Sequence, residues 1–208
     1  MPRKLHTTLI PVAAVVVLAI ACGTEKTSGP TTLDNTAYPS TIGTEWVYER
    51  INQEWNMQDT LTITLERDSI APDGVRIGIA SFEVNGVRRQ TRFLRIAGDT
   101  IEWYVHALGQ SGFYLLERYI LPMEPGDKWK MLDAFRAYDT MYVLDRNAVS
   151  VPFGTFSRTY HLNRLMTDSA TGAIQLDDEQ YYAPGYGIVK RRTDDMQSED
   201  LWELIDFN

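Results

Sequence analysis

Apolar side chains recur at every second position in short runs over most of this chain. In the segment 60–65, threonine alternates with leucine or isoleucine, and Ile101, Trp103 and Val105 show the same period. Successive side chains of a β-strand point to opposite faces of a sheet, so this period predicts strands. The segment 194–204 can also be written as an amphipathic helix, but residues 201–207 alternate better as a closing strand.

Turn sequences that contain glycine or proline separate these runs at intervals of about ten residues. Asn85-Gly86 is the strongest of them, because both residues tolerate the positive φ of a type I′ hairpin turn. In the run 93–96, Phe93 and Arg95 alternate with Leu94 and Ile96, and the run 113–120 is nearly all apolar or aromatic, so we expect both to be covered on both faces. The sequence predicts one all-β domain over residues 38–208, a mostly antiparallel meander curled into a half-barrel or barrel, with little or no helix.

Residues 1–21 are predicted to be a signal peptide. Arg3 and Lys4 precede an apolar core, residues 9–20, which is shorter than the roughly 20 residues of a membrane-spanning helix. Pro11 would kink such a helix. A basic start, a short apolar core and small residues before the cleavage point are typical of a secretory signal. The alternative is a retained N-terminal helix with a chance cysteine.

The only cysteine, Cys22, follows Leu18-Ala19-Ile20-Ala21 and precedes a polar stretch. These residues resemble the lipobox of bacterial lipoprotein precursors, although Ala19 stands where leucine is commoner. The resemblance implies cleavage before Cys22, a diacylglycerol on its sulfur and a further acyl chain, such as palmitate, on the new N-terminus. Several acyl chains would anchor the protein at a membrane. Gly23, in place of the aspartate that retains such proteins at the inner membrane, implies the periplasmic side of the outer membrane.

Residues 22–37 are polar after the cysteine and show no apolar period, which predicts a flexible tether. The chain has 20 Lys+Arg and 28 Asp+Glu, a net charge of −8; the leader contains two basic residues and no acid, so without it the charge is −10. An acidic chain without a basic block is a poor candidate for nucleic-acid binding. Anionic lipid head groups would also repel it, so membrane attachment should rely on the acyl chains.

Two passages share the spacing Pro-x3-Gly-x2-Trp, at residues 39–46 and 122–129. Proline presets the loop, glycine takes a turn conformation, and tryptophan then enters a core. One interpretation is two related halves, 39–121 and 122–208. The simpler one, which we favour from the sequence, is one loop-to-strand solution used twice, because short motifs recur by chance.

Two glycine-rich motifs follow in the second half, Val-Pro-Phe-Gly-Thr-Phe at 151–156 and Tyr-Tyr-Ala-Pro-Gly-Tyr-Gly-Ile-Val-Lys at 181–190. They resemble the Val-Pro-x-Gly-Thr-Phe and Tyr-x-Ala-Pro-Gly-x-Gly-x-Val-Lys segments of a large group of uncharacterised bacterial envelope lipoproteins, and Gly-x2-Trp-x-Tyr at 43–48 is similar too. The resemblance implies a β-rich fold akin to the curled sheets of lipoprotein carriers, and it brings no catalytic residue. The glycines themselves predict turns and close backbone approaches, so these are structural motifs first.

The chain is rich in large aromatic residues, with five tryptophans and eleven tyrosines. One interpretation is an apolar cavity or groove in the curled sheet that accepts a lipid or another amphiphile. Its candidate lining residues are Trp46, Trp103, Trp129 and Tyr160. The other interpretation is ordinary core and surface aromatics, which sheets prefer in any case, and the period alone does not separate the two.

Two histidines remain after the leader, His106 and His161. No zinc-ligand spacing, Gly-x-Ser-x-Gly motif or phosphate-binding glycine loop is present, so we predict no catalytic residue, metal or cofactor. The acidic run 177–179 lacks calcium-loop spacing and is expected in a solvated turn, with Asp178 on the opposite face from its neighbours. The basic run 190–192 is expected to form exposed ion pairs.

The sequence therefore predicts a lipid-anchored envelope lipoprotein that is not an enzyme, a binding or assembly protein that holds an amphiphile in its curled sheet. The alternative is a structural or adaptor lipoprotein that docks an envelope protein through a strand edge or an aromatic patch. A third hypothesis, a hydrolase, would need His106 or His161 within hydrogen-bond reach of a hydroxyl and a carboxylate.

Overall fold

The computed structural model describes residues 38–208 except 72, 107–111, 133–137, 169 and 196–197. The predicted leader, Cys22 and the tether lie outside the described residues. The described part of the chain contains twelve strands and no helix, so the predicted all-β class is confirmed. It accordingly offers no helix long and apolar enough to cross a bilayer.

The strands follow one another along the chain with short connections. They are β1 (Glu45–Asn52), β2 (Met57–Ile70), β3 (Arg76–Val84), β4 (Val87–Ala97), β5 (Thr100–His106), β6 (Phe113–Ile120), β7 (Lys128–Leu132), β8 (Tyr138–Val151), β9 (Gly154–Thr167), β10 (Ile174–Ala183), β11 (Gly187–Asp195) and β12 (Ser198–Phe207).

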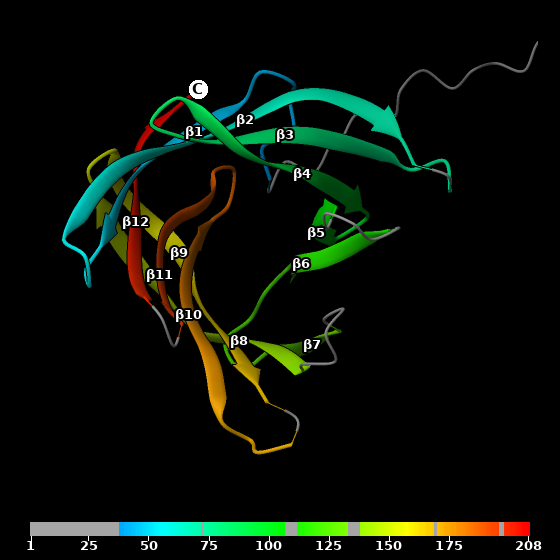
Figure 1. Ribbon diagram of the computed structural model, residues 1–208. Coiled ribbons are helices and arrows are strands. Elements are labelled where there is room, and N and C mark those ends of the chain that lie inside the picture. The colour runs from blue at the N-terminus through cyan, green and yellow to red at the C-terminus, as the bar shows by residue number, and fades with distance from the viewer. Residues whose placement is uncertain (1–37, 72, 107–111, 133–137, 169, 196–197) are drawn as a thin grey trace, which may run out of the picture.

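All twelve strands form one antiparallel sheet with the order β6-β5-β4-β3-β2-β1-β12-β11-β10-β9-β8-β7. Strands adjacent in sequence pair with each other except β6 and β7, and β1 also pairs with β12, so two meanders join back to back. The sheet curls until its two end strands approach each other, which gives a nearly closed barrel (Figure 1). The predicted antiparallel meander, curled into a barrel, is confirmed.

Two local predictions are also confirmed. Asn85 and Gly86, with φ of 51° and 73°, turn the chain between β3 and β4. The described residues of the segment 194–204 belong to the end of β11 and to β12 rather than to a helix.

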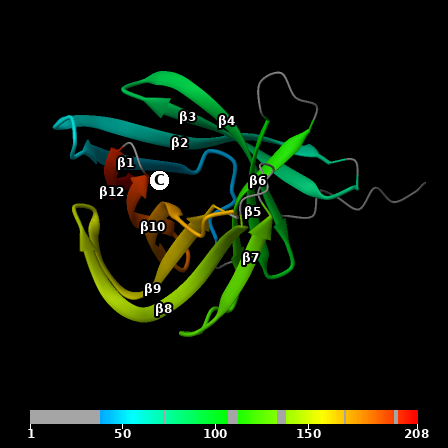
Figure 2. The same cartoon turned by 60° about the horizontal axis from the view of Figure 1, so that its bottom comes forward.

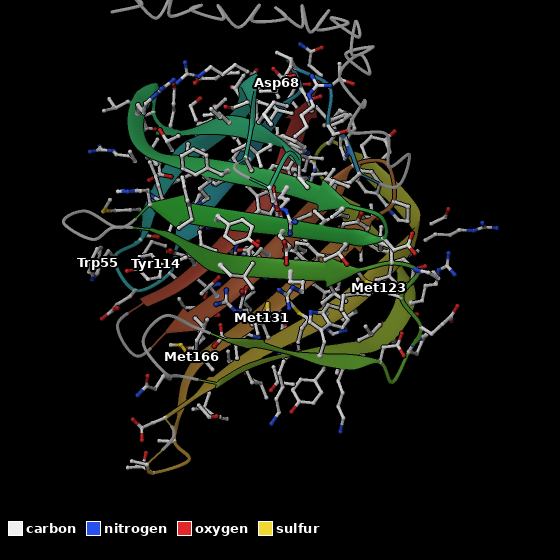
Figure 3. All side chains as sticks on the ribbon, turned by 90° about the vertical axis from the view of Figure 1, so that its right-hand side faces the viewer. Trp55, Asp68, Tyr114, Met123, Met131 and Met166 are labelled. Carbon is white, nitrogen blue, oxygen red and sulfur yellow. The ribbon has the colours of Figure 1, made fainter. Side chains whose placement is uncertain are left out.

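A seam separates the end strands β6 and β7. Within the described residues no backbone ladder joins them, and the indole Nε1 of Trp129 crosses the seam to donate to the carbonyl oxygen of Arg118 at 2.9 Å. Figure 3 faces this side of the barrel, with Met123 in the connecting loop and Met131 on β7 labelled. Both methionines are buried, so the seam is lined by apolar side chains.

The two Pro-x3-Gly-x2-Trp passages fold alike. Gly43 N donates to Leu65 O and Gly126 N donates to Val143 O, both at 2.8 Å, and the two glycines have φ of 94° and 96°. The return bonds, from Leu65 N to Thr44 O and from Val143 N to Asp127 O, are both 2.9 Å. Each passage opens a meander of six strands, β1–β6 or β7–β12. This equivalence favours the interpretation of two related halves.

The core lies inside the barrel, because alternate side chains of the strands point inward and the described residues form no second layer on the outer face. Leu94 is fully buried, while its neighbours Phe93 and Arg95 are only half-buried. On β6, Glu117 and Tyr119 are buried but Phe113 is 55% exposed. The prediction that 93–96 and 113–120 are covered on both faces is therefore wrong. A single-layer barrel covers one face of each strand, and the apolar outer residues form a surface patch.

Candidate functional site

The barrel interior contains a network of charged side chains centred on Arg191 of β11. Its Nε and Nη2 donate to the two oxygens of Asp178 at 2.8 and 2.7 Å, and its Nη1 donates to Glu117 Oε1 at 2.8 Å. Asp178 is fully buried and Arg191 nearly so. The predictions of a solvated turn at 177–179 and of exposed pairs throughout 190–192 are wrong here, because both segments lie inside strands whose alternation turns these two side chains inward. Asp178 does face away from Asp177 and Glu179, as expected.

Burial alone would raise the pKa of Glu117, but the charges of Arg191, Arg92 and Arg164 outweigh this effect and lower it to about 2. The other Glu117 oxygen accepts a hydrogen bond from the Tyr119 hydroxyl at 2.8 Å. Glu117 is therefore a carboxylate held by several partners, an arrangement that fixes the interior instead of leaving a reactive acid.

The interior leaves little free space beside this network. A cavity of about 40 Å³ lies between Trp46, Trp103, Tyr38 and the Glu117–Arg191 pair. Its volume accommodates one or two water molecules, whose share of liquid volume is about 30 Å³, whereas pockets for small molecules measure roughly 300–1,000 Å³.

The four predicted lining residues are thus only partly brought together. Trp46 and Trp103 line the small cavity, and both rings pack on Tyr38, whose hydroxyl accepts a 3.1 Å hydrogen bond from Trp103 Nε1. Trp129 lies at the seam, and Tyr160 is buried beneath the guanidinium of Arg146, 4.8 Å from its ring centroid.

A larger pocket lies where the long β8–β9 hairpin curls back toward β12. Phe153, at the tip of the hairpin, donates its backbone N–H to Leu204 O of β12 at 3.0 Å, and Figure 2 shows the curl of these two strands. We call the space on its inner side the hairpin pocket. It measures about 440 Å³, and its walls come from β8, β9 and the two glycine-rich turns: Arg146, Phe153, Phe156, Ser157, Arg158 and Tyr186 are its main lining residues.

Aromatic rings make one wall of the hairpin pocket rigid. The Phe156 ring packs edge-on against Tyr186 with a centroid distance of 4.9 Å, and Tyr186 packs on Phe207 at 5.0 Å. Trp46 Nε1 donates to the Tyr186 carbonyl oxygen at 2.6 Å, which ties this wall to the barrel core. The two motifs at 151–156 and 181–190 therefore meet in space.

The hairpin pocket also has a cationic part. Arg146 and Arg158 are exposed, and within the described part of the chain neither forms an ion pair. No aspartate or glutamate is among the residues that line the pocket. A hollow with two free guanidiniums and an aromatic wall is thus formed on a chain whose net charge is −8.

The described chain begins next to this pocket. Tyr38 stacks on Tyr182, and a Cβ added at Gly187 would lie 3.1 Å from the Tyr38 ring. Tyr182 and Gly187 flank the β10–β11 turn, whose Ala183, Pro184 and Tyr186 line the pocket. The described chain therefore begins at the end of the barrel where the pocket lies.

A second hollow, the outer pocket, lies on the outside of β3–β6. It measures about 380 Å³ and is almost entirely apolar, with Ile77, Phe93, Tyr104 and Phe113 in its walls. Phe93 and Phe113 pack edge-on at 4.8 Å. Its rim is charged, because Arg95 pairs there with both Asp73 and Glu102 at 3.0 Å.

The histidines lie outside both pockets. His161 Nδ1 is 3.5 Å from Asp145 Oδ2 and its ring stacks on Tyr181, whereas His106 packs on the ring of Phe113. The described residues include no hydroxyl hydrogen-bonded to His161, whose Nε2 is buried without a partner. Nor do they include a group of three His, Cys, Asp or Glu side chains placed to hold a metal ion.

Sequence reasoning missed the hairpin pocket and the buried charge network. The motifs at 151–156 and 181–190 were identified, but as structural turns. A signal for the network was present: Tyr182 and Val189 mark the inward parity of β10 and β11, and that parity also includes Asp178 and Arg191.

Comparisons with known proteins place the fold. No protein-family model matches the chain, and no curated protein sequence matches it. Among solved structures, a candidate exported protein with a YmcC-like fold from Bacteroides fragilis is similar, with a TM-score of 0.53 and 13% identity over 83% of this chain and 99% of that chain. At this identity the likeness concerns the fold alone.

Two further structures match less closely. A candidate lipoprotein from Parabacteroides distasonis has a TM-score of 0.46 and 14% identity over 83% of this chain and 98% of that chain. A β-barrel-like protein of a domain of unknown function, DUF1849, from Brucella abortus has a TM-score of 0.45 and 8% identity over 81% of this chain and 98% of that chain.

Proposed function

We propose that this chain is a lipid-anchored lipoprotein of the bacterial envelope, without enzymatic activity, that binds an amphiphile in the hairpin pocket. The acyl chains on Cys22 hold it at the periplasmic face of the outer membrane. The domain then presents the pocket to a ligand that is partly apolar and partly polar.

The observation that carries this proposal is the size and lining of the hairpin pocket. At about 440 Å³ it falls in the usual range of ligand sites, whereas the interior cavity of about 40 Å³ does not. An aromatic wall together with polar and cationic side chains suits a ligand with two unlike ends. The proposed binding site is therefore the hairpin pocket and not the small cavity beside the candidate lining residues Trp46 and Trp103.

The envelope location rests on the leader, on Cys22 and on the resemblance of the glycine-rich motifs to envelope lipoproteins. A lipoprotein and an exported protein among the similar structures agree with it.

The test is a fluorescence titration of the full chain carrying Cys22→Ser, with a dansyl-labelled fatty acid as the probe. We expect saturable binding that Ser157→Trp abolishes, because the indole fills the hairpin pocket from an exposed position. Phe113→Ala, which opens the outer pocket, is the matched control and should leave binding unchanged. Absence of binding, or loss only in the Phe113 variant, contradicts the proposal.

A second function, docking of an envelope protein, is favoured by the outer pocket, where Phe113 is exposed beside an apolar hollow. A photocrosslinking residue in place of Phe113 should then capture a partner in the intact envelope. The same residue in place of the exposed Trp55, at another surface, should capture none. Equal capture at both positions would count against docking at the outer pocket.

A further inference from the structure

We infer that the hairpin pocket recognises an anionic head group, and that its occupant is an acidic lipid of the membrane surface to which the protein is anchored. This inference rests on the proposed function, because it names the class of amphiphile that the same pocket takes.

The hairpin pocket contains two arginines, Arg146 and Arg158. Eight described arginines form ion pairs. Of the described arginines without an ion pair, Arg146 and Arg158 lie together in one pocket that has no acidic lining residue. Guanidinium groups bind phosphate and carboxylate oxygens with paired hydrogen bonds. Two of them in one hollow provide more donors than the protein itself satisfies there.

Arg146 is supported by the aromatic ring beneath it. Its guanidinium lies over the ring of Tyr160, which is buried and fixed, so the cation is supported from one side while its N–H groups remain available at the edge. Asp145, the adjacent acid, points to the other face of β8 and approaches His161 instead. The acid nearest in sequence therefore does not neutralise the site.

The hairpin pocket lies near the residue at which the described chain begins. Residues 23–37 separate Cys22 from Tyr38, and even a fully extended chain of that length spans at most about 55 Å. Tyr38 enters the domain beside the β10–β11 turn that lines the pocket. The start of the described chain and the pocket thus lie at one end of the barrel. Anchoring through a tether of this length would keep the pocket at a high effective concentration of lipid head groups.

The cationic hairpin pocket contrasts with the negative net charge of the chain. The chain as a whole is acidic, so an anionic membrane repels it on average. Attraction to acidic lipids must then be local and must depend on the two pocket arginines. Added salt must also weaken this attraction more than it weakens the contact between the aromatic wall and apolar groups.

The test is vesicle co-sedimentation of the full chain carrying Cys22→Ser, with vesicles of phosphatidylcholine alone or mixed with phosphatidylglycerol. We expect at least tenfold stronger binding to the mixed vesicles. The double variant Arg146→Gln, Arg158→Gln should lose this preference. The matched control is Arg67→Gln, Arg89→Gln, which removes the same charge from exposed arginines that form no ion pair in the described part of the chain. This control should keep the preference.

Two further measurements separate the outcomes. Inorganic phosphate should not displace the protein from the mixed vesicles at concentrations that leave ionic strength unchanged. Displacement would identify a free anion as the occupant and would overturn the inference that the occupant is a membrane lipid. A titration with a neutral dansyl-labelled fatty alcohol tests the proposed function separately. Equal binding of the alcohol and the fatty acid by the wild type overturns the head-group inference and leaves amphiphile binding intact. Binding of neither probe overturns both.

Discussion

Trp46 and Tyr186 are 140 residues apart in sequence, and the indole Nε1 of Trp46 donates to the carbonyl oxygen of Tyr186 at 2.6 Å. This bond joins the first strand of the sheet to the turn that lines the hairpin pocket. It links the opening loop-to-strand motif with the glycine-rich motif of the second half.

Trp46→Phe should lower the free energy of unfolding by about 1–3 kcal/mol, because the partly buried carbonyl of Tyr186 loses its donor. Urea denaturation measures this loss. Trp55→Phe is the control, because Trp55 is 64% exposed and its change should cost less than about 0.5 kcal/mol. Similar losses for both variants would show that the 2.6 Å bond contributes nothing.

Two adjacent arginines should differ sharply in their contribution to stability. Arg191→Met leaves Asp178 and Glu117 buried without their cation, and breaking a buried pair in this way costs about 3–5 kcal/mol. Arg192→Met removes exposed pairs with Glu179 and Glu199 and should cost less than about 1 kcal/mol. Urea denaturation of the two variants would contradict this expectation if the losses were equal.

Acid should destabilise the fold through Glu117. Its pKa in the folded state is about 2, below its ordinary value of 4.5, so the unfolded chain binds the proton more readily. The resulting stabilisation is fully present above about pH 4.5 and is lost as the pH falls toward 2. The difference corresponds to about 3 kcal/mol. Glu117→Gln should flatten the dependence of unfolding free energy on pH in this window, and an unchanged slope would assign the acid sensitivity to other carboxylates.

Alanine substitutions at Gly187 and Gly86 distinguish backbone strain from steric contact with a neighbouring side chain. Both have positive φ, 84° and 73°, so alanine at either position is strained by about 1–2 kcal/mol. At Gly86 the new Cβ meets no atom within 4 Å, but at Gly187 it lies 3.1 Å from the Tyr38 ring. Thermal unfolding should therefore show the larger loss for Gly187→Ala, and a larger loss for Gly86→Ala would mean that Tyr38 does not pack there.

Local pattern was enough to predict the strands, the Asn85-Gly86 turn and the antiparallel class. Each of these features depends on residues close in sequence: the alternation of side chains, or two residues that accept positive φ. The pairing of β1 with β12 depends on residues about 150 positions apart, such as Tyr48 and Leu204, and no local pattern encodes it. The barrel could therefore be proposed from the sequence, but not its seam.

The site was harder to predict for the same reason. From the sequence alone, Asp178 is expected to be solvated, because burying a carboxylate without a paired cation is costly. That cation, Arg191, comes from the next strand, and only the register of β10 and β11 brings the two together. The hairpin pocket likewise needs Arg146, Arg158 and Tyr186 to converge through the curl of β8 and β9, which depends on tertiary contacts.

The two six-strand halves give the barrel wall two equivalent joins, and these joins are closed in different ways. Between β12 and β1 the backbone is laddered from Trp46 to Asn52, whereas no ladder joins the described residues of β6 and β7, where the Trp129 indole donates across the seam. The circumference is therefore set on one side and adjustable on the other. The wall can widen along that line, or accept another extended segment there, without breaking any ladder that it already has.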